Sequence, residues 1–137
     1  MRIYKLPIIL AFTSLTGCFS PQAVQSNIHN ESDLQLAQDY YGAKPMTCVG
    51  NYYCDDVRSE LQSRDVIPAD EWTYVNSNTV VIGMGALAVV AAWGQPTDVN
   101  TTTTSAGEED QWVYSPCETC KSSYVYLKNG VVTAIQN

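Results

Sequence analysis

The chain has 137 residues, a length that suits one domain with a tail. It carries 14 acidic residues against seven basic ones, a formal net charge of −7 with its single histidine neutral. An acidic domain repels phosphate backbones, which argues against nucleic acid as a partner.

The first 17 residues have the pattern of an export signal. Arg2 and Lys5 give a short positive start, and an apolar stretch follows them. The tetrapeptide LTGC, ending at Cys18, resembles the lipobox of bacterial lipoproteins, in which cleavage precedes a cysteine that is then acylated, for example with palmitate. Each buried methylene of such chains adds roughly 0.8 kcal/mol of membrane affinity. We therefore expect a signal peptide over residues 1–17 and a lipid anchor at Cys18. The alternative is an ordinary secretory signal with a chance cysteine.

Four further cysteines indicate disulfide bonds, because an even number in an exported chain is typical of them. Cys48 lies close to Cys54, and Cys117 lies close to Cys120, so we expect these two pairings among three alternatives. Such small loops gain about 2–3 kcal/mol each from closure. A four-cysteine zinc site is less favoured, since the export signal, the irregular spacing and the lack of a histidine ligand count against it.

Residues 18–45 are polar and poor in large apolar side chains, which is typical of a tether. Asp33–Tyr41 suits one or two helical turns, although nothing in the sequence requires them. His29 is the only histidine and lies in this stretch, so neither a catalytic triad nor a histidine metal site is expected. The folded domain is therefore predicted over residues 46–137, beginning with a turn stapled by Cys48 and Cys54.

Two stretches of this domain, Asp55–Arg64 and Ala69–Val75, have apolar side chains at helical spacing. The side chains expected to point inward are Val57, Leu61, Trp72 and Val75. A short extended segment, Thr79–Ile82, is expected to lead into a third helix.

The third helix, Ala86–Trp93, has no polar side chain and ends before Gly94 and Pro96, which together form a helix stop. It is far shorter than the roughly 20 residues that span a bilayer. A helix that is apolar all round must be covered on more than one side. We therefore expect this segment to be the central core helix.

After Pro96 the pattern changes from helical to alternating. Thr97–Thr104 is rich in β-branched residues, which suit a partly exposed strand better than a low-complexity linker. Ala106–Asp110 is expected to be a solvated turn, because a calcium loop needs its ligands at regular intervals. Gln111–Tyr114 and Ser123–Leu127 are expected to be further strands.

The dipeptide Asn129-Gly130 is the strongest hairpin signal in the chain, since both residues accept positive φ. A two-residue turn there pairs Lys128 with Val131 and, with a regular register, Tyr124 with Ile135. One face of the hairpin is then expected to pack on the central helix and to carry Val125, Leu127, Val132 and Ala134. The other is expected to carry Tyr124, Tyr126, Thr133 and Ile135, extended by Trp112 and Tyr114. This aromatic face is either a second packed layer beneath the N-terminal helices or a partner-binding surface.

The motif Cys117-Glu118-Thr119-Cys120 is the one signal of an enzyme. Thioredoxin-like proteins place CxxC at the start of a helix, whose N-terminus lowers the thiol pKa. Here the motif lies between two predicted strands, so a loop closed by a disulfide is the better interpretation. Gly83 and Gly85 lack the rest of a nucleotide-binding fingerprint. We predict a protein that is not an enzyme and has no cofactor, metal or small-molecule substrate, with a thiol–disulfide oxidoreductase as the alternative.

The order of these signals resembles the SmpA/OmlA family of small outer-membrane lipoproteins, which includes the BamE subunit of the β-barrel assembly machinery. The resemblance covers roughly Val80–Asn137 and rests on the lipobox, Gly83-Met84 before an apolar helix, Trp93-Gly94-Gln95-Pro96, the Trp112–Tyr114 strand and the final hairpin. It implies an α+β fold with two to three short helices packed on a small three- to four-stranded antiparallel sheet. A secreted β-lactamase inhibitor group shares that fold, so the fold alone assigns no function. The family usually has Ser or Thr where this chain has Gly85, and its pattern lacks the CETC loop.

The sequence and the resemblance together predict a lipoprotein of the outer membrane whose domain faces the periplasm. It would be a structural, protein-binding subunit of an envelope complex, either the barrel-assembly machinery or the outer-membrane ring of a secretion or conjugation system. Phe19 after the lipidated cysteine favours the outer membrane. The candidate partner contacts are Trp112, Tyr114, Tyr124 and Tyr126, with the Thr101–Thr104 strand as an edge for strand addition. An inhibitor or ligand-binding module is a further alternative.

Overall fold

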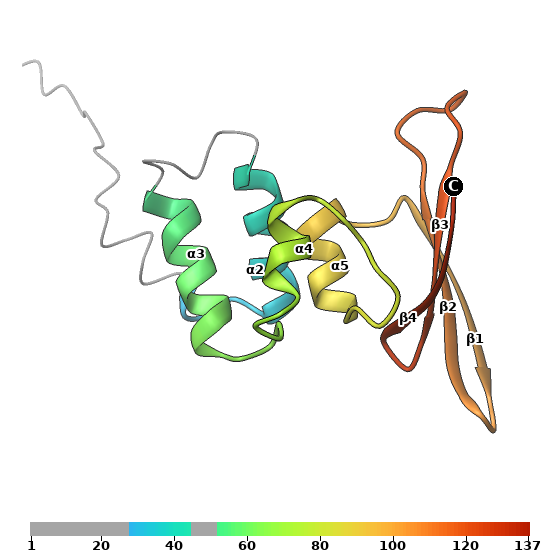
Figure 1. Cartoon of the computed structure of the whole chain (residues 1–137), viewed down its shortest axis with the longest axis horizontal. Helices are drawn as coiled ribbons and strands as arrows, with labels where there is room; N and C mark the ends of the chain where they lie inside the picture. The colour runs from blue at the N-terminus through green and yellow to red at the C-terminus, as the bar shows by residue number, and fades with distance from the viewer. Residues whose placement is uncertain (1–27, 45–51) are drawn as a thin grey trace, which may run out of the picture.

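A computed structural model of the chain describes residues 28–44 and 52–137 (Figure 1). Within them, helices come first and strands follow. The helices are α2 (Asp33–Ala43), α3 (Tyr52–Ser63), α4 (Trp72–Asn76) and α5 (Ala86–Trp93). The strands are β1 (Asp98–Thr104), β2 (Gly107–Tyr114), β3 (Ser123–Lys128) and β4 (Val131–Gln136). The described helices all lie on one side of an antiparallel sheet, which confirms the predicted α+β class (Figure 1).

Helix α5 is the centre of the core, with the bounds expected from the sequence. Residues 88–92 are all buried, and the helix packs against both α2 and α4. Gly85 precedes the helix without a side chain to cap it, and the Glu71 carboxylate accepts the Gly85 amide instead, at 3.2 Å. At the other end Gly94 adopts φ 82°, which ends the helix as predicted. The sheet contributes Val125, Leu127 and Val132 to the same core.

Helix α2 corrects the interpretation of residues 18–45 as a tether. Its Ser32 cap accepts the Gln35 amide at 3.2 Å, and Leu36, Ala37 and Tyr40 are buried against the rest of the core. These positions form a stripe along one helix face, but small alanines and a tyrosine make that stripe weakly hydrophobic. The folded unit therefore includes residues 28–44, and residues 18–27 and 45 of the expected tether lie outside the described residues.

Helices α3 and α4 confirm two predicted elements with shifted ends. Val57 and Leu61 are fully buried in α3, and Val75 is fully buried in α4 with Trp72 almost so. Helix α3 begins three residues earlier than predicted, at Tyr52, so it includes Cys54. Most of the predicted stapled turn, residues 45–51, lies outside the described residues. None of the described helices has the length and apolar character needed to cross a membrane.

The sheet is a meander in which each strand pairs with its neighbour in sequence, in the order β1-β2-β3-β4. The expected acidic turn at Ala106–Asp110 is wrong, because β2 already begins at Gly107 and the β1–β2 turn is Ser105-Ala106. The acidic residues gain cross-strand partners there: Glu109 accepts from Lys128 at 3.0 Å, and Asp110 accepts from the Thr101 hydroxyl.

The β3–β4 hairpin has the predicted turn but not the predicted register beyond it. Lys128 pairs with Val131 and Leu127 with Val132, and then the register shifts by one so that Val125 pairs with Ile135. Thr133 is the extra residue of this bulge, and its hydroxyl donates to the Tyr126 carbonyl at 3.2 Å. The shift turns Ile135 toward the helices and leaves Ala134 on the opposite face, which reverses the predicted placement of both.

Candidate functional site

The four aromatic residues predicted as one partner surface lie on opposite faces of the sheet. Directly paired residues of an antiparallel sheet share a face, and Trp112 pairs with buried Val125, whereas Tyr124 pairs with Val113. Trp112 and Tyr114 therefore face the helices, where both pack against the core. Tyr124 and Tyr126 face the other way. The expected extension of the aromatic face by Trp112 and Tyr114 is wrong.

Tyr114 links the sheet to the end of α5. Its hydroxyl donates to the Gly94 carbonyl at 3.1 Å, and its ring meets Trp93 edge-on at a centroid distance of 5.3 Å and an angle of 84°. Burial raises the pKa of Tyr114 well above its usual range. The side chain is therefore a neutral spacer between helix and strand at physiological pH.

The face that points away from the helices, called here the outer face, carries Tyr124, Tyr126 and a chain of amides. A hydrogen-bonded row crosses all four strands: Asn100 to Gln111 (3.2 Å), Gln111 to the Tyr126 hydroxyl (3.0 Å), and that hydroxyl to Gln136 (3.3 Å). All described helices lie on the opposite side of the sheet, so the interpretation of this face as a layer packed beneath the N-terminal helices is wrong (Figure 1).

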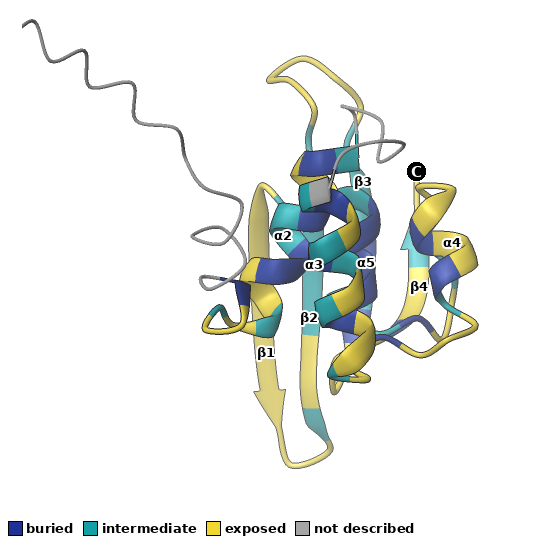
Figure 2. Cartoon of the chain, turned by 90° about the vertical axis from the view of Figure 1, so that its left-hand side faces the viewer, coloured by how far each residue is buried: buried dark blue, intermediate teal, exposed yellow. Residues whose placement is uncertain are grey.

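Strand β1 is the edge of the sheet and is exposed along its whole length (Figure 2). Backbone groups in an antiparallel strand point alternately to its two sides. The Asn129 amide donates to the Glu108 carbonyl, so Glu108 points to β3, and by alternation Gly107 and Glu109 point to β1. It follows that the backbone groups of Val99, Thr101 and Thr103 point away from the sheet.

The two edges of the sheet differ in how they are protected. Exposed edges are normally protected by lysine, proline, a bulge or a covering segment. The start of β4 is covered, because Gly83 donates to the Val132 carbonyl at 2.8 Å and Val132 donates to the Met84 carbonyl at 2.9 Å. These covering residues directly follow Thr79–Ile82, the segment expected to be extended, which forms no strand; the isolated bridge pairs Gly85 with Val131. No described element pairs with the edge of β1, and residues 99–104 contain neither proline nor charge.

The disulfide between Cys117 and Cys120 is present as predicted. It closes a surface loop between β2 and β3, in which the Cys120 amide donates to the Cys117 carbonyl at 3.2 Å. Among the described residues no helix begins at this loop, so no helix N-terminus is present to lower a thiol pKa. Cys54 is also disulfide-bonded. Its predicted partner Cys48 lies outside the described residues, as do the lipidation candidate Cys18 and the signal residues 1–17.

Two clusters of ionisable groups join α2 and the residues before it to α3. Arg64 donates to Glu60 at 2.8 Å, to Asp33 at 2.9 Å and to the Ile28 carbonyl at 3.2 Å, and His29 pairs with Glu60 at 2.7 Å. These contacts fix the start of the folded chain onto α3. His29, expected in a tether, is part of this clamp. Except for the Arg64–Glu60 pair, which is four residues apart, these contacts join residues more than 30 positions apart, so the sequence shows no periodic signal for them.

A second cluster brings two carboxylates together. Asp39 accepts from the Tyr53 hydroxyl and from the Gln35 amide, both at 2.9 Å. Burial, together with the charge and side-chain hydrogen bond of Asp39, raises the pKa of Glu31. Burial and the Asp39 bond also raise the pKa of Tyr53 to about 12. The described residues contain no group of three or more acidic, cysteine or histidine side chains placed to hold a metal ion.

No protein family, no curated protein and no solved structure matches the chain.

Proposed function

We propose that the protein is a non-enzymatic lipoprotein, anchored through Cys18 to the outer membrane, whose periplasmic domain is a structural, protein-binding subunit of an envelope complex. The observation that supports this most directly is that the edge of β1 is open, whereas the start of β4, at the opposite edge of the sheet, is covered. A protein keeps a long unprotected edge at the risk of aggregation, and a partner strand that occupies it removes that risk. The resemblance to the SmpA/OmlA family supports the barrel-assembly machinery or an outer-membrane ring as the complex.

Binding would occur by strand addition, in which an extended segment of the partner adds a fifth strand beside β1. The amides of Thr101 and Thr103 would donate to the partner, and their carbonyls would accept from it. The Val99 amide is engaged by its neighbour, since the Asp98 carboxylate accepts it at 3.0 Å. Pairing is therefore expected to centre on residues 101–104. Side chains of the partner would extend both the outer face and the helix-facing side.

A mild-detergent pull-down of the tagged, full-length lipidated protein tests this, with co-purifying proteins identified by mass spectrometry. Thr103→Pro removes the outward amide, while Thr103→Val keeps it at nearly the same volume. The Thr103 side chain makes no hydrogen bond with the described residues, so Thr103→Val is a matched control. We expect Thr103→Pro to lose the complex and Thr103→Val to retain it. Equal recovery of the complex with both variants would reject strand addition. If the unaltered protein were recovered without any co-purifying protein, the subunit role would be rejected.

A further inference from the structure

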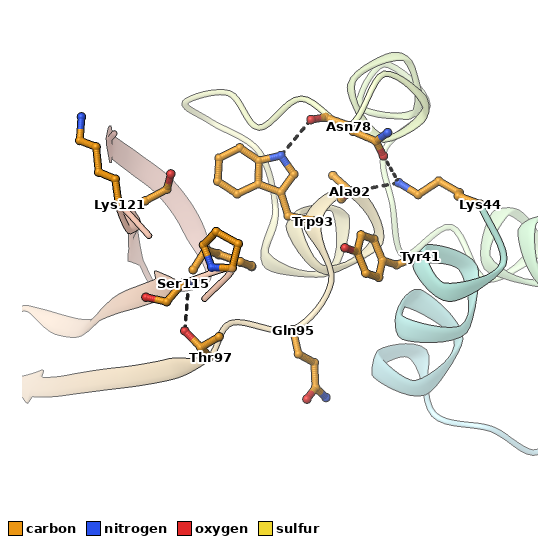
Figure 3. A pocket seen from close by; sticks show the side chains of 12 residues that line it. Tyr41, Lys44, Asn78, Ala92, Trp93, Gln95, Thr97, Ser115 and Lys121 are labelled. Carbon is orange, nitrogen blue, oxygen red and sulfur yellow. Dashed lines mark hydrogen bonds between the residues drawn. The ribbon is translucent and has the colours of Figure 1, made fainter. Parts of the chain in front are cut away.

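A groove separate from the β1 edge opens where α2, the end of α5 and the β2–β3 loop meet (Figure 3). Its volume is about 730 Å³, within the range of roughly 300–1,000 Å³ that holds small organic ligands. Three aromatic side chains, Tyr41, Trp93 and Tyr114, line it together with Pro116.

The charge of the groove is opposite to that of the chain. The sequence has 14 acidic and seven basic residues, yet the lining contains Lys44 and Lys121 and no acidic residue. The two lysines lie on opposite sides of Trp93 (Figure 3). In a chain of net charge −7, such a place attracts an anion and repels a cation.

The aromatic wall is held in place before any ligand arrives. The Trp93 indole donates to the Asn78 carbonyl at 2.9 Å, and Tyr114 holds the same ring edge-on. Tyr41 lies against Gly94, where even a Cβ atom would come within 2.6 Å of its ring. A fixed wall loses little side-chain entropy when an apolar group packs on it.

The two lysines differ in how many N–H donors remain available to a ligand. The Lys44 ammonium already uses three, to the carbonyls of Val75 and Ala92, both at 3.1 Å, and to the Asn78 amide oxygen at 2.7 Å. Lys121 is exposed and makes no hydrogen bond or ion pair with the described residues. The groove thus offers one free ammonium beside an apolar wall.

These features select a singly charged ligand. The end of α5 that meets the groove is its C-terminus, which carries partial negative charge and disfavours a doubly charged phosphate. Phosphate sites also use several donors, from arginine or from backbone amides. We propose that the groove binds a carboxylate attached to an apolar, ring-sized body, with the body against Trp93 and Tyr41 and the carboxylate at Lys121. Such a group belongs to a small organic acid or to the C-terminal residue of a peptide.

The test is an NMR titration of the purified full-length protein with N-acetyl-L-phenylalanine and, as its neutral counterpart, N-acetyl-L-phenylalaninamide. The readout is the indole N–H signal of Trp93, with those of Trp72 and Trp112 as internal controls because neither lines the groove. We expect a saturable shift of the Trp93 signal, with the amide binding at least about tenfold more weakly at low salt. No shift up to about 20 mM, or affinities of acid and amide within about threefold, would overturn the proposal.

Two lysine variants test which side chain binds the ligand carboxylate. Lys121→Gln should bring the acid and the amide to within about threefold of each other, whereas Lys128→Gln, on the outer face, should keep the tenfold difference. An unchanged preference in Lys121→Gln would overturn the assignment of the carboxylate site. Phenylacetate, which lacks the peptide group, separates the two sources. Binding as tight as that of N-acetyl-L-phenylalanine identifies a small organic acid, and binding at least about tenfold weaker identifies a peptide C-terminus.

Discussion

At the scale of single residues, Lys44 shows how burial and hydrogen bonding compete. Its ammonium ties α2 to the loop after α4 and to the end of α5, and burial lowers its pKa to about 8. In the unfolded chain the same ammonium has its ordinary pKa of about 10.4. Between these two values the unfolded state binds more protons than the folded state, so the free energy of unfolding rises with pH.

We predict that the unaltered protein gains stability from pH 8 to pH 10 relative to Lys44→Met, which has no such titration. Above pH 10 both proteins lose stability as the pH rises, because Tyr53, with a pKa raised to about 12, stays protonated in the folded state while it ionises in the unfolded state; this loss is common to both and leaves their difference unchanged. Urea unfolding of both proteins across this range measures the difference in slope. Parallel pH profiles of the two proteins would show that Lys44 does not cause the rise in stability between pH 8 and pH 10.

Gly94 is a second residue whose local conformation the fold depends on. Its φ of 82° is strained for any side chain, and Tyr41 occupies the space that a Cβ would need. We predict that Gly94→Ala lowers the free energy of unfolding by about 2 kcal/mol or more. Gly42→Ala is the matched control, because Gly42 lies in α2 with open space around it. That change should be neutral or stabilising by up to about 1 kcal/mol in denaturant unfolding.

At the scale of elements, helix α2 matters most, because it covers α5 where a tether was expected. We predict that Leu36→Ala lowers the free energy of unfolding by about 2–4 kcal/mol, since Leu36 is fully buried. Leu34→Ala, at a position 47% exposed on the same helix, should change it by less than about 0.5 kcal/mol. If both variants had equally small effects on thermal or urea unfolding, residues 33–43 would belong to the tether and not to the folded core.

Elements could be predicted where one strong local signal set them. The apolar run with its glycine and proline stop gave α5 its observed bounds, and Asn129-Gly130 gave the final turn. Prediction from the sequence failed for elements that depend on contacts between segments far apart in the chain. The buried face of α2 is weakly hydrophobic and can be recognised only when α5, the helix that it covers, is in place. The bulge at Thr133 places Ile135, and not Ala134, on the side of the sheet that faces the helices. That unforeseen shift also changed the predicted composition of the outer face.

At the scale of the whole molecule, helices on one side only leave a sheet with two unlike faces. The outer face carries Tyr124 and Tyr126 and contributes little to the core, so its side chains are free to vary without unfolding the domain. We predict that replacing both tyrosines with serine abolishes co-purification with the envelope complex while the far-UV circular dichroism spectrum stays unchanged. A double variant that still recovers the complex would leave β1 as the only proposed contact.

The candidate site was predictable in its parts and not in its assembly. Local composition was enough to predict the tyrosines, the Thr-rich edge and the Cys117–Cys120 loop. The predicted face of Trp112 and Tyr114 was wrong, because the face of a strand depends on its pairing register and no local signal fixed the pairing of β2 with β3. The groove beside Trp93 was not predicted, since its lining comes from α2, α5 and the β2–β3 loop, which only the folded chain brings together.

The meander order of the strands has a kinetic consequence. Each strand pairs only with the next one along the chain, so the sheet contains no crossover and no parallel pair. Folds dominated by such local pairings have low contact order and form quickly, since little chain entropy is lost before each contact is made. The last two strands meet through the tight turn at Asn129-Gly130, and a hairpin of this kind closes within about 1–10 μs. The slower step should be the docking of α2 on α5, which joins segments about 50 residues apart.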